Sequence, residues 1–182
     1  MRKEYLVILI IFFVLFFGIV YFSSKEQSAS LENITATSIK PKTEEKRVTP
    51  TGMHEYISDA YSFSVFYPEE LKVDERSEGE GATTITFQNI KDGKGFQIFI
   101  LPYFNSQVSE SRFRKDIPSG VRTGIVDFEI GGAVGASFYS KDLVLGDTYE
   151  IWFVKNNFLY EVTTLKNLNV WLDDIMKNWK FL

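Results

Sequence analysis

The sequence predicts an α+β domain, in which helices flank an antiparallel sheet, preceded by one transmembrane helix. Three observations support this prediction. Short segments between residues 53 and 164 alternate apolar and polar side chains, as half-buried strands do. The last segment repeats apolar residues at helical spacing instead. The N-terminus contains an uncharged apolar run of membrane-spanning length. If two helices cover opposite faces of the sheet, the domain is an α/β/α sandwich.

The apolar run extends from Tyr5 to Phe22, and 15 of its 18 residues are Leu, Ile, Val or Phe. As a helix it rises about 27 Å, close to a hydrocarbon core of roughly 30 Å. We therefore expect residues 5–22 to anchor the chain in the lipid bilayer as a single-pass helix. The alternative is a cleaved signal peptide with its site at Ser28-Ala29-Ser30. The run exceeds the usual apolar length of such peptides, and that site lies well beyond its end.

Residues 1–4 form a short tip whose charges predict the orientation of the anchor. Arg2 and Lys3 precede the apolar run and Glu4 offsets them only weakly, whereas Lys25 is followed by Glu26. Positive charge marks the cytoplasmic side of a membrane segment. We therefore expect a cytoplasmic N-terminus and an extracytoplasmic location for residues 23–182.

Residues 23–52 are rich in Ser, Thr, Lys and Glu and contain no aromatic residue. A segment of this composition buries too little apolar surface to fold. We expect a disordered tether with a reach of about 30 Å, followed by one globular domain at residues 53–182. Asn33-Ile34-Thr35 matches the N-glycosylation acceptor pattern, a match that a Ser/Thr-rich linker readily produces by chance.

The globular domain is acidic, with 13 Lys and Arg against 19 Asp and Glu, a net charge of −6. Nucleic-acid binding depends on neutralising phosphates, so we expect no nucleic-acid partner. An anionic lipid surface would also repel the domain. The chain has no cysteine, which excludes disulfides, thiolate metal sites and cysteine nucleophiles.

Alternating or apolar segments bounded by turn residues predict strands, from which we expect a mostly antiparallel sheet of six to eight strands. In chain order these segments are residues 53–59, 61–67, 71–76, 82–89, 96–101, 124–130, 133–140, 148–154 and 158–164. Residues 96–101 are apolar on nearly both faces, which indicates a central strand. Residues 77–81 read as a loop. Asn156-Asn157 provides a two-residue hairpin turn that tolerates positive φ.

Two helices complete the predicted domain. The first spans residues 108–115 and is ended by Pro118. The second carries a single apolar stripe, formed by Leu168, Trp171, Leu172, Ile175, Met176 and Trp179. We expect this stripe to pack on the sheet, with an ion pair between Asp173 and Lys177 on the outer face. Lys177 and Lys180 suit the C-terminal end of this helix.

Both ends of the domain resemble the PsbP-like family. Residues 61–68, YSFSVFYP, are similar to the family's opening strand, Y-G-F-S-x-x-Y-P, with Ser62 in place of the usual glycine. Residues 171–181 are similar to the family's last helix and its short S-F/W-K-F tail. The hairpin through Tyr149, Trp152, Phe158 and Tyr160 fits the strand pair before that helix. The resemblance covers about residues 55–182 and implies an antiparallel sheet between helices.

The resemblance implies little about function. The named PsbP-like proteins are extrinsic subunits of photosystem II that help to retain calcium and chloride at the oxygen-evolving site. Relatives in non-photosynthetic bacteria are mostly uncharacterised envelope proteins. This chain departs from the photosynthetic members in its predicted anchor and tether. No metal-binding or photosystem-contact residue of the family matches a position here, so the resemblance implies no cofactor and no site residue.

The residues themselves offer few candidates for chemistry. His54 is the only histidine and adjoins the tether, whereas a catalytic triad needs a histidine held in a pocket. The candidate carboxylates lack EF-hand spacing; they are Glu69/Glu70, Asp74/Glu75, Glu78/Glu80 and Asp173/Asp174. The loop Glu78-Gly79-Glu80-Gly81 is at most a weak site for Ca²⁺ or Mg²⁺. The run GGAVG at residues 131–135 lacks the Lys-Ser/Thr of a phosphate loop and predicts a tight turn. We assign no catalytic, metal-binding or cofactor-binding residue.

The sequence therefore predicts a non-enzymatic, membrane-anchored extracytoplasmic domain that binds a protein or small ligand, or stabilises an envelope complex. The alternative is a hydrolytic or metal-dependent envelope enzyme that uses carboxylates alone. A third possibility is an accessory subunit of an anchored multiprotein machine, in which residues 5–22 also pack against partner helices. A deep pocket with at least two convergent acids would favour the enzyme.

Overall fold

A computed structural model describes residues 47–182 of the chain. The predicted tip, anchor and most of the tether lie outside these described residues. Residues 48–182 form a compact unit with its own hydrophobic core, as expected of a domain that folds by itself. Within the described part, no helix combines the length and the apolar character that crossing a bilayer requires.

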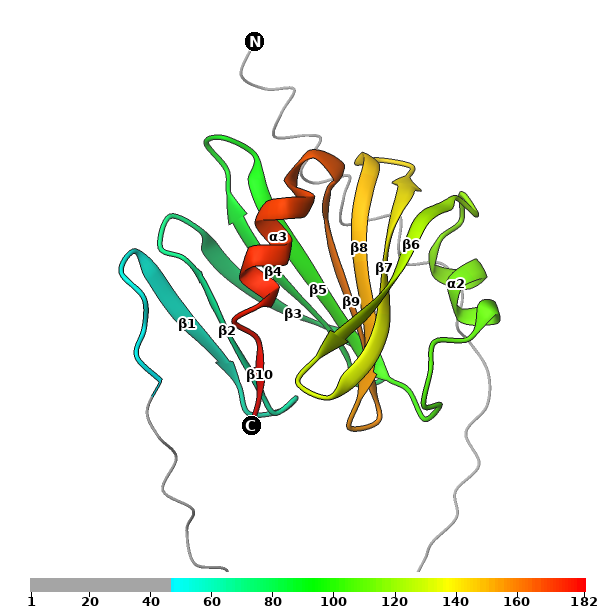
Figure 1. Cartoon of the computed structure of the whole chain (residues 1–182), viewed down its shortest axis with the longest axis horizontal. Coiled ribbons are helices and arrows are strands. Elements are labelled where there is room, and N and C mark those ends of the chain that lie inside the picture. Colours follow the sequence, from blue (N-terminus) through cyan, green and yellow to red (C-terminus); the bar gives the residue numbers. More distant parts are fainter. Residues whose placement is uncertain (1–46) are drawn as a thin grey trace, which may run out of the picture. The chain divides into compact units, whose positions relative to one another are not determined.

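Residues 47–182 contain ten strands, two α-helices and one 3₁₀ helix (Figure 1). In chain order they are β1 (Met53–Ser58), β2 (Phe63–Pro68), β3 (Lys72–Gly79), β4 (Ala82–Asn89), β5 (Lys94–Pro102), α2 (Glu110–Asp116), β6 (Arg122–Ile130), β7 (Ala133–Asp142), β8 (Gly146–Lys155), β9 (Phe158–Leu165), η1 (Lys166–Leu168), α3 (Asn169–Met176) and β10 (Lys180–Phe181).

The strands form two antiparallel sheets. Seven strands make the large sheet in the order β3-β4-β5-β9-β8-β7-β6, which confirms the predicted sheet of six to eight strands and the interior position of β5. The small sheet, β1-β2-β10, was not predicted. It forms because β2 ends at Pro68 and the chain then enters the other sheet, while the C-terminal residues return to pair with β2.

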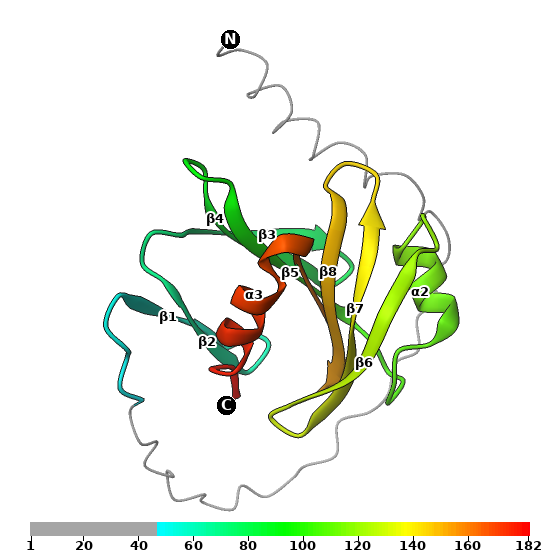
Figure 2. The ribbon, with the colours of Figure 1, turned by 45° about the horizontal axis from the view of Figure 1, so that its top comes forward.

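The main core lies between the small sheet and one face of the large sheet. Phe63 and Val65 of β2 are fully buried there against alternate residues of β4, β5, β8 and β9. α3 covers the same face, as Figures 1 and 2 show. On the opposite face, Phe113 of α2 stacks on Trp152 of β8 at 4.9 Å between ring centroids. Helices therefore lie on both faces of the large sheet, as an α/β/α sandwich requires.

The C-terminal helix is shorter than its apolar stripe predicts. α3 ends at Met176, and the backbone N–H of Trp179 then donates to the Met176 carbonyl in a tight turn that leads into β10. Lys180 consequently lies in a strand, and Lys177 pairs with Asp174 at 2.7 Å instead of with Asp173. The stripe itself packs on the core, where Leu172, Ile175, Met176 and Trp179 are buried.

Two predicted turns are present and one loop is shorter than expected. Asn156 and Asn157 have φ of 52° and 63° in the β8–β9 hairpin, as a type I′ turn requires. Gly131 and Gly132 also have positive φ and join β6 to β7, which confirms the tight turn. Residues 77–81 are not all loop, because β3 continues to Gly79 and only Glu80-Gly81 form the turn.

Candidate functional site

The polar residues that the sequence singles out do not converge on one site. His54 is exposed on β1, with its ring 5.8 Å from that of Tyr67. The paired acids are separate surface groups, at the β2–β3 turn (Glu69, Glu70), on β3 and its turn (Asp74, Glu75, Glu78, Glu80) and on α3 (Asp173, Asp174). Among residues 47–182, no three His, Cys, Asp or Glu side chains are arranged to hold a metal ion. Asn33 lies outside the described residues.

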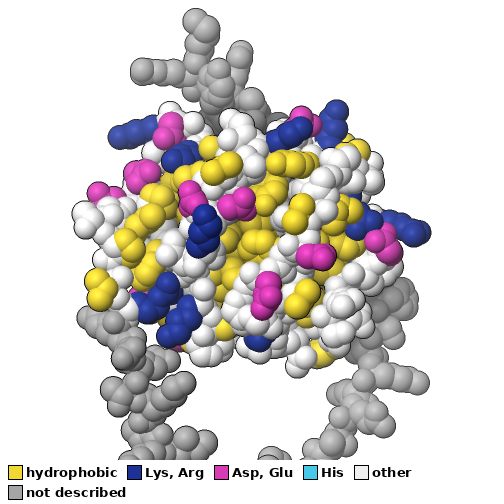
Figure 3. All heavy atoms as spheres, viewed as in Figure 1, with side chains coloured by type: hydrophobic (Ala, Val, Ile, Leu, Met, Phe, Trp, Pro, Cys, Tyr) yellow, Lys and Arg dark blue, Asp and Glu magenta, His cyan; other side chains and the backbone are white. Residues whose placement is uncertain are grey.

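Asp173 and Asp174 border a groove of about 510 Å³ between α3 and β6. Apolar side chains line it, among them Val126 and Phe128 of β6 and Trp179 after α3. Figure 3 shows this face, where a yellow apolar strip runs between acidic side chains on two sides. A groove of this size can hold several side chains of a ligand.

The turn between β6 and β7 closes one end of the groove. A Cβ atom added to Gly131 would lie 2.7 Å from the ring of Phe181 in β10, so the turn rests directly on that ring. Lys155 of β8 donates to the Gly132 carbonyl at 3.3 Å and holds the turn from the other side. The large sheet is therefore curled over the small one, as Figures 1 and 2 show, and the groove forms where the curl leaves a space.

The rim of the groove is negatively charged. Four carboxylates line it, Asp127 and Glu129 on β6 and Asp173 and Asp174 on α3, together with one cation, Lys177, so the net charge is −3. Lys177 is already paired with Asp174. The groove therefore attracts positively charged ligands.

Tyr149 of β8 forms the hydrogen-bonded part of the groove wall. Its hydroxyl donates to Oδ1 of Asp173 at 2.8 Å. Burial raises the pKa of Tyr149 to about 12; a hydrogen bond to Ser137 opposes the rise, and Asp173 adds to it. The phenol is therefore neutral at pH 7, and it fixes the Asp173 side chain on the wall.

A second polar cluster lies on the opposite face of the large sheet, beneath α2, and its residues were not among the predicted candidates. Glu150 of β8 is buried, and its carboxylate accepts hydrogen bonds from Thr148 at 2.7 Å, Thr163 at 2.6 Å and Trp152 at 3.3 Å. Burial raises the pKa of Glu150, although these three hydrogen bonds oppose the rise. Since its acceptors are occupied, Glu150 serves to fix the sheet under α2.

Glu161 of β9 is the other buried acid of this cluster. Arg112 of α2 lies 3.6 Å from its Oε1 atom and also pairs with Asp116, one turn further along the helix. Burial raises the pKa of Glu161 well above its ordinary value, and the nearby Asp116 carboxyl raises it further. A signal was available in the sequence, because Glu150 and Glu161 each stand between an aromatic and an aliphatic residue in the middle of a strand.

The described residues thus form a seven-stranded antiparallel sheet with helices on both faces, closed by α3 and the short strand β10. The chain is similar to the solution structure of cyanobacterial PsbP (CyanoP) from Synechocystis sp. PCC 6803, with a TM-score of 0.52 and 12% sequence identity. The match covers 74% of this chain and 95% of that chain, and it confirms the predicted PsbP-like fold. No protein-family model matches the chain, and no curated protein sequence is similar to it.

Proposed function

We propose that this chain is a membrane-anchored, extracytoplasmic and non-enzymatic binding domain that engages a protein partner through the groove between α3 and β6. The groove carries the proposal, because it combines an apolar floor with a charged rim and lies open at the surface of an otherwise well-packed domain. Interfaces bury an apolar centre and surround it with a polar rim. The predicted anchor and tether would hold this surface at an average distance of about 30 Å from the bilayer.

The fold supports a binding role in general terms. The photosystem II subunits that the sequence resembles act as parts of a protein complex. That resemblance does not identify a partner for this chain. We therefore infer the partner's chemistry from the residues that line the groove.

The carboxylate enzyme remains the alternative, because four acids line one groove. Two of them already have partners: Asp173 accepts from Tyr149, and Asp174 pairs with Lys177. Glycoside hydrolysis, the best-known two-carboxylate chemistry, needs one acid protonated and the other ionised across a substrate cleft. A binding rim needs only the charge, which this arrangement supplies.

Co-purification from detergent-solubilised membranes tests the proposal. The full chain and a fragment with residues 48–182 serve as baits, each as wild type and with Val126→Arg, which places a bulky cation in the groove. Val134→Arg is the matched control, because Val126 and Val134 are both 60% exposed and lie on neighbouring strands, but Val134 does not line the groove. We expect a partner that wild type and Val134→Arg retain and that Val126→Arg loses. Equal retention by both variants would place the interface elsewhere.

The enzymatic alternative and the topology have their own tests. Asp127→Asn with Glu129→Gln would abolish a hydrolytic activity of the purified chain, whereas a binding domain has no such activity to lose. Protease added to intact cells should cut within residues 53–182, because we propose that they face outward. Protection of these residues would overturn the extracytoplasmic assignment.

A further inference from the structure

We infer that the partner segment in the groove is an extended, basic stretch of polypeptide that pairs with β6 as an additional strand of the large sheet. The inference rests on the proposed function and names the ligand of that groove. Five features of the structure support it: the direction of the groove, the chemistry of the two sheet edges, the length of the regular part of β6, the charge of the rim and the repulsion between two copies of β6.

The groove runs along the edge of β6. Six consecutive residues, 126–131, line it. Side chains of a strand alternate between faces, so a pocket on one face touches every second residue. A space that touches each residue in turn reaches the strand's edge, and Ser137 of β7 and Tyr149 of β8 show that it also extends over the inner face of the sheet. β6 is the last strand of the large sheet, and no described strand pairs with that edge.

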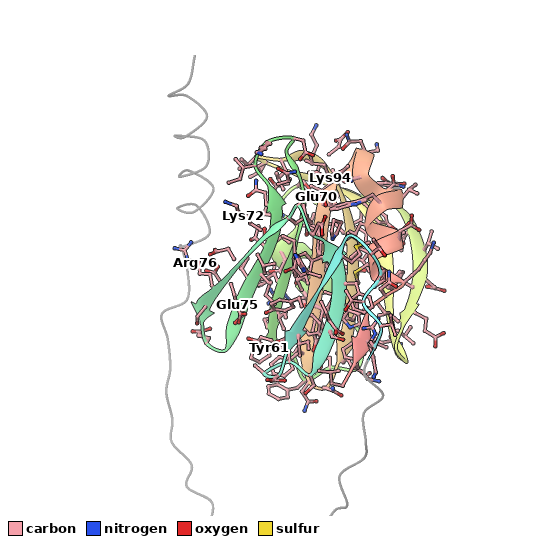
Figure 4. The ribbon with its side chains drawn as sticks, turned by 90° about the vertical axis from the view of Figure 1, so that its left-hand side faces the viewer. Tyr61, Glu70, Lys72, Glu75, Arg76 and Lys94 are labelled. Carbon is pink, nitrogen blue, oxygen red and sulfur yellow. The ribbon has the colours of Figure 1, made fainter. Side chains whose placement is uncertain are left out.

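The two edges of the large sheet differ in chemistry. β3, at the other edge, carries five charged residues among eight, KVDERSEG, and Figure 4 shows Lys72, Glu75 and Arg76 along that edge. Charged side chains prevent an edge from pairing with another chain. β6 instead exposes Ile125 and Val126, at 56% and 60%. β3 therefore has the features of a protected edge, and β6 has those of an edge that accepts a strand.

The regular part of β6 is long enough for strand addition. A bulge separates Thr123 from Val126, where Gly124 has a φ of 62°, and such bulges normally protect an edge. Beyond it, Val126 to Ile130 pair with β7 without interruption. Five residues in register extend about 17 Å, enough for the main-chain hydrogen bonds on which strand addition depends.

The charge of the rim selects a basic segment. Asp127 and Glu129 alternate with Val126 and Phe128 along β6, so each apolar position that a new strand would meet lies beside an acid. A segment that alternates Lys or Arg with aliphatic residues therefore matches both the apolar and the acidic positions of β6. Oppositely charged cross-strand pairs contribute roughly 0.2–1 kcal/mol each.

The same acids disfavour a second copy of this chain as the occupant. Two β6 strands paired antiparallel about Phe128 would place Asp127 of one copy opposite Glu129 of the other, twice. Like charges directly opposite each other destabilise a sheet. The edge is therefore unsuited to self-pairing and suited to a partner of opposite charge.

Fluorescence anisotropy with synthetic peptides tests the inference. The probe is a labelled octapeptide, (Lys-Val)₄, added to the full chain in detergent micelles and to the 48–182 fragment. A second probe, (Glu-Val)₄, reverses the charge. Two further peptides carry N-methyl groups at alternate residues, on one strand edge or on the other, and keep the charge of the first. Val134→Arg again serves as the control variant.

We expect (Lys-Val)₄ to bind both proteins and (Glu-Val)₄ to bind them at least ten-fold more weakly. Val126→Arg should weaken the binding of (Lys-Val)₄ at least ten-fold, whereas Val134→Arg should change it less than two-fold. One of the two N-methylated peptides should bind at least ten-fold more weakly than (Lys-Val)₄, because the N–H groups that it leaves unmethylated point away from β6. Equal binding of both N-methylated peptides and the parent would overturn strand addition, even if the co-purified partner still depends on Val126. If (Lys-Val)₄ bound the 48–182 fragment but not the full chain, residues 23–47 of the tether, which the fragment lacks, would be the occupant of the groove. That result would overturn the assignment to a partner.

Discussion

Replacement of Trp179 tests how the C-terminal turn closes the core. Trp179 is only 6% exposed, and its ring stacks on Phe63 at 4.1 Å between centroids with an interplanar angle of 8°. Edge-to-face contacts join it to Phe153 at 5.4 Å and Tyr160 at 5.7 Å. Its indole N–H is buried and has no hydrogen-bond acceptor among the described residues. The side chain therefore contributes packing and carries one unsatisfied polar group.

These contacts give different magnitudes for two substitutions. Trp179→Ala removes the whole ring system and leaves a cavity, which costs about 3–5 kcal/mol. Trp179→Phe keeps a ring against Phe63 and loses only a few ring atoms, at about 0.8 kcal/mol for each CH₂ equivalent. It also removes the unpaired N–H, whose burial costs about 1–3 kcal/mol. The two contributions nearly cancel, so we expect Trp179→Phe to change stability by no more than about 1 kcal/mol.

Urea unfolding of the 48–182 fragment, followed by far-UV circular dichroism, measures both free energies of unfolding. The free energy of unfolding falls by about 2 kcal/mol per M of urea. The urea midpoint should therefore fall by about 2 M for Trp179→Ala and change by no more than about 0.5 M for Trp179→Phe. If Trp179→Phe loses as much as Trp179→Ala, the reasoning about the unpaired indole N–H is wrong. If neither loses more than 1 kcal/mol, the turn does not close the core.

Three further predictions concern the sheet and its titrating groups. Gly135→Ala would drive a Cβ into the backbone at Trp152, and we expect a loss of at least about 3 kcal/mol in urea unfolding; a shift within 0.5 kcal/mol contradicts this. Tyr149→Phe removes the bond to Asp173, at about 1 kcal/mol near pH 7. Burial raises the pKa of Tyr149 in the folded state to about 12, so its contribution to the free energy of unfolding is fully present below about pH 10 and is lost as the pH rises through 12. Between about pH 10 and 12 the stability of Tyr149→Phe should therefore fall less steeply than that of wild type. Glu161 also has a raised pKa in the folded state, so its contribution to the free energy of unfolding is complete below about pH 4.3 and declines above it. Glu161→Gln should therefore flatten the decline of the urea midpoint between about pH 4.5 and 8. An unchanged decline would show that other groups cause it.

Local signals predicted much of the fold. The β8–β9 hairpin followed from Asn156-Asn157, because that pair tolerates the positive φ that a two-residue turn needs. The apolar stripe before Trp179 predicted a core-packing helix, since its spacing places one face on the sheet. Its length was overestimated because the pairing of β10 with β2 ends the helical turn early, and that pairing is a long-range effect.

The groove could not be read from the sequence, because it depends on which strand lies at the edge. The segment GIVDFEI in β6 reads as an ordinary strand, and only the order of strands in the sheet shows that its apolar residues are uncovered. Asp173 was singled out as one of a pair of adjacent acids, but its contact with Tyr149 joins residues that are 24 positions apart. The buried Glu150 and Glu161 were predictable in principle, because each stands between an aromatic and an aliphatic residue in the middle of a strand.

The small sheet joins the two ends of the domain, and this has a consequence for how the chain folds during synthesis. β2 pairs with β10 across more than a hundred residues, and the Tyr160 hydroxyl donates to the Tyr61 carbonyl across 99 positions. Contacts between such distant segments form late, because the loop they close must first be ordered. The β1–β2 hairpin is made first but has no third strand and no stacked Trp179 until residues 179–181 have left the ribosome. The small sheet and the Phe63–Trp179 stack are therefore completed only after β9, α3 and β10 have been made, so Phe63 lacks its stacking partner through most of synthesis.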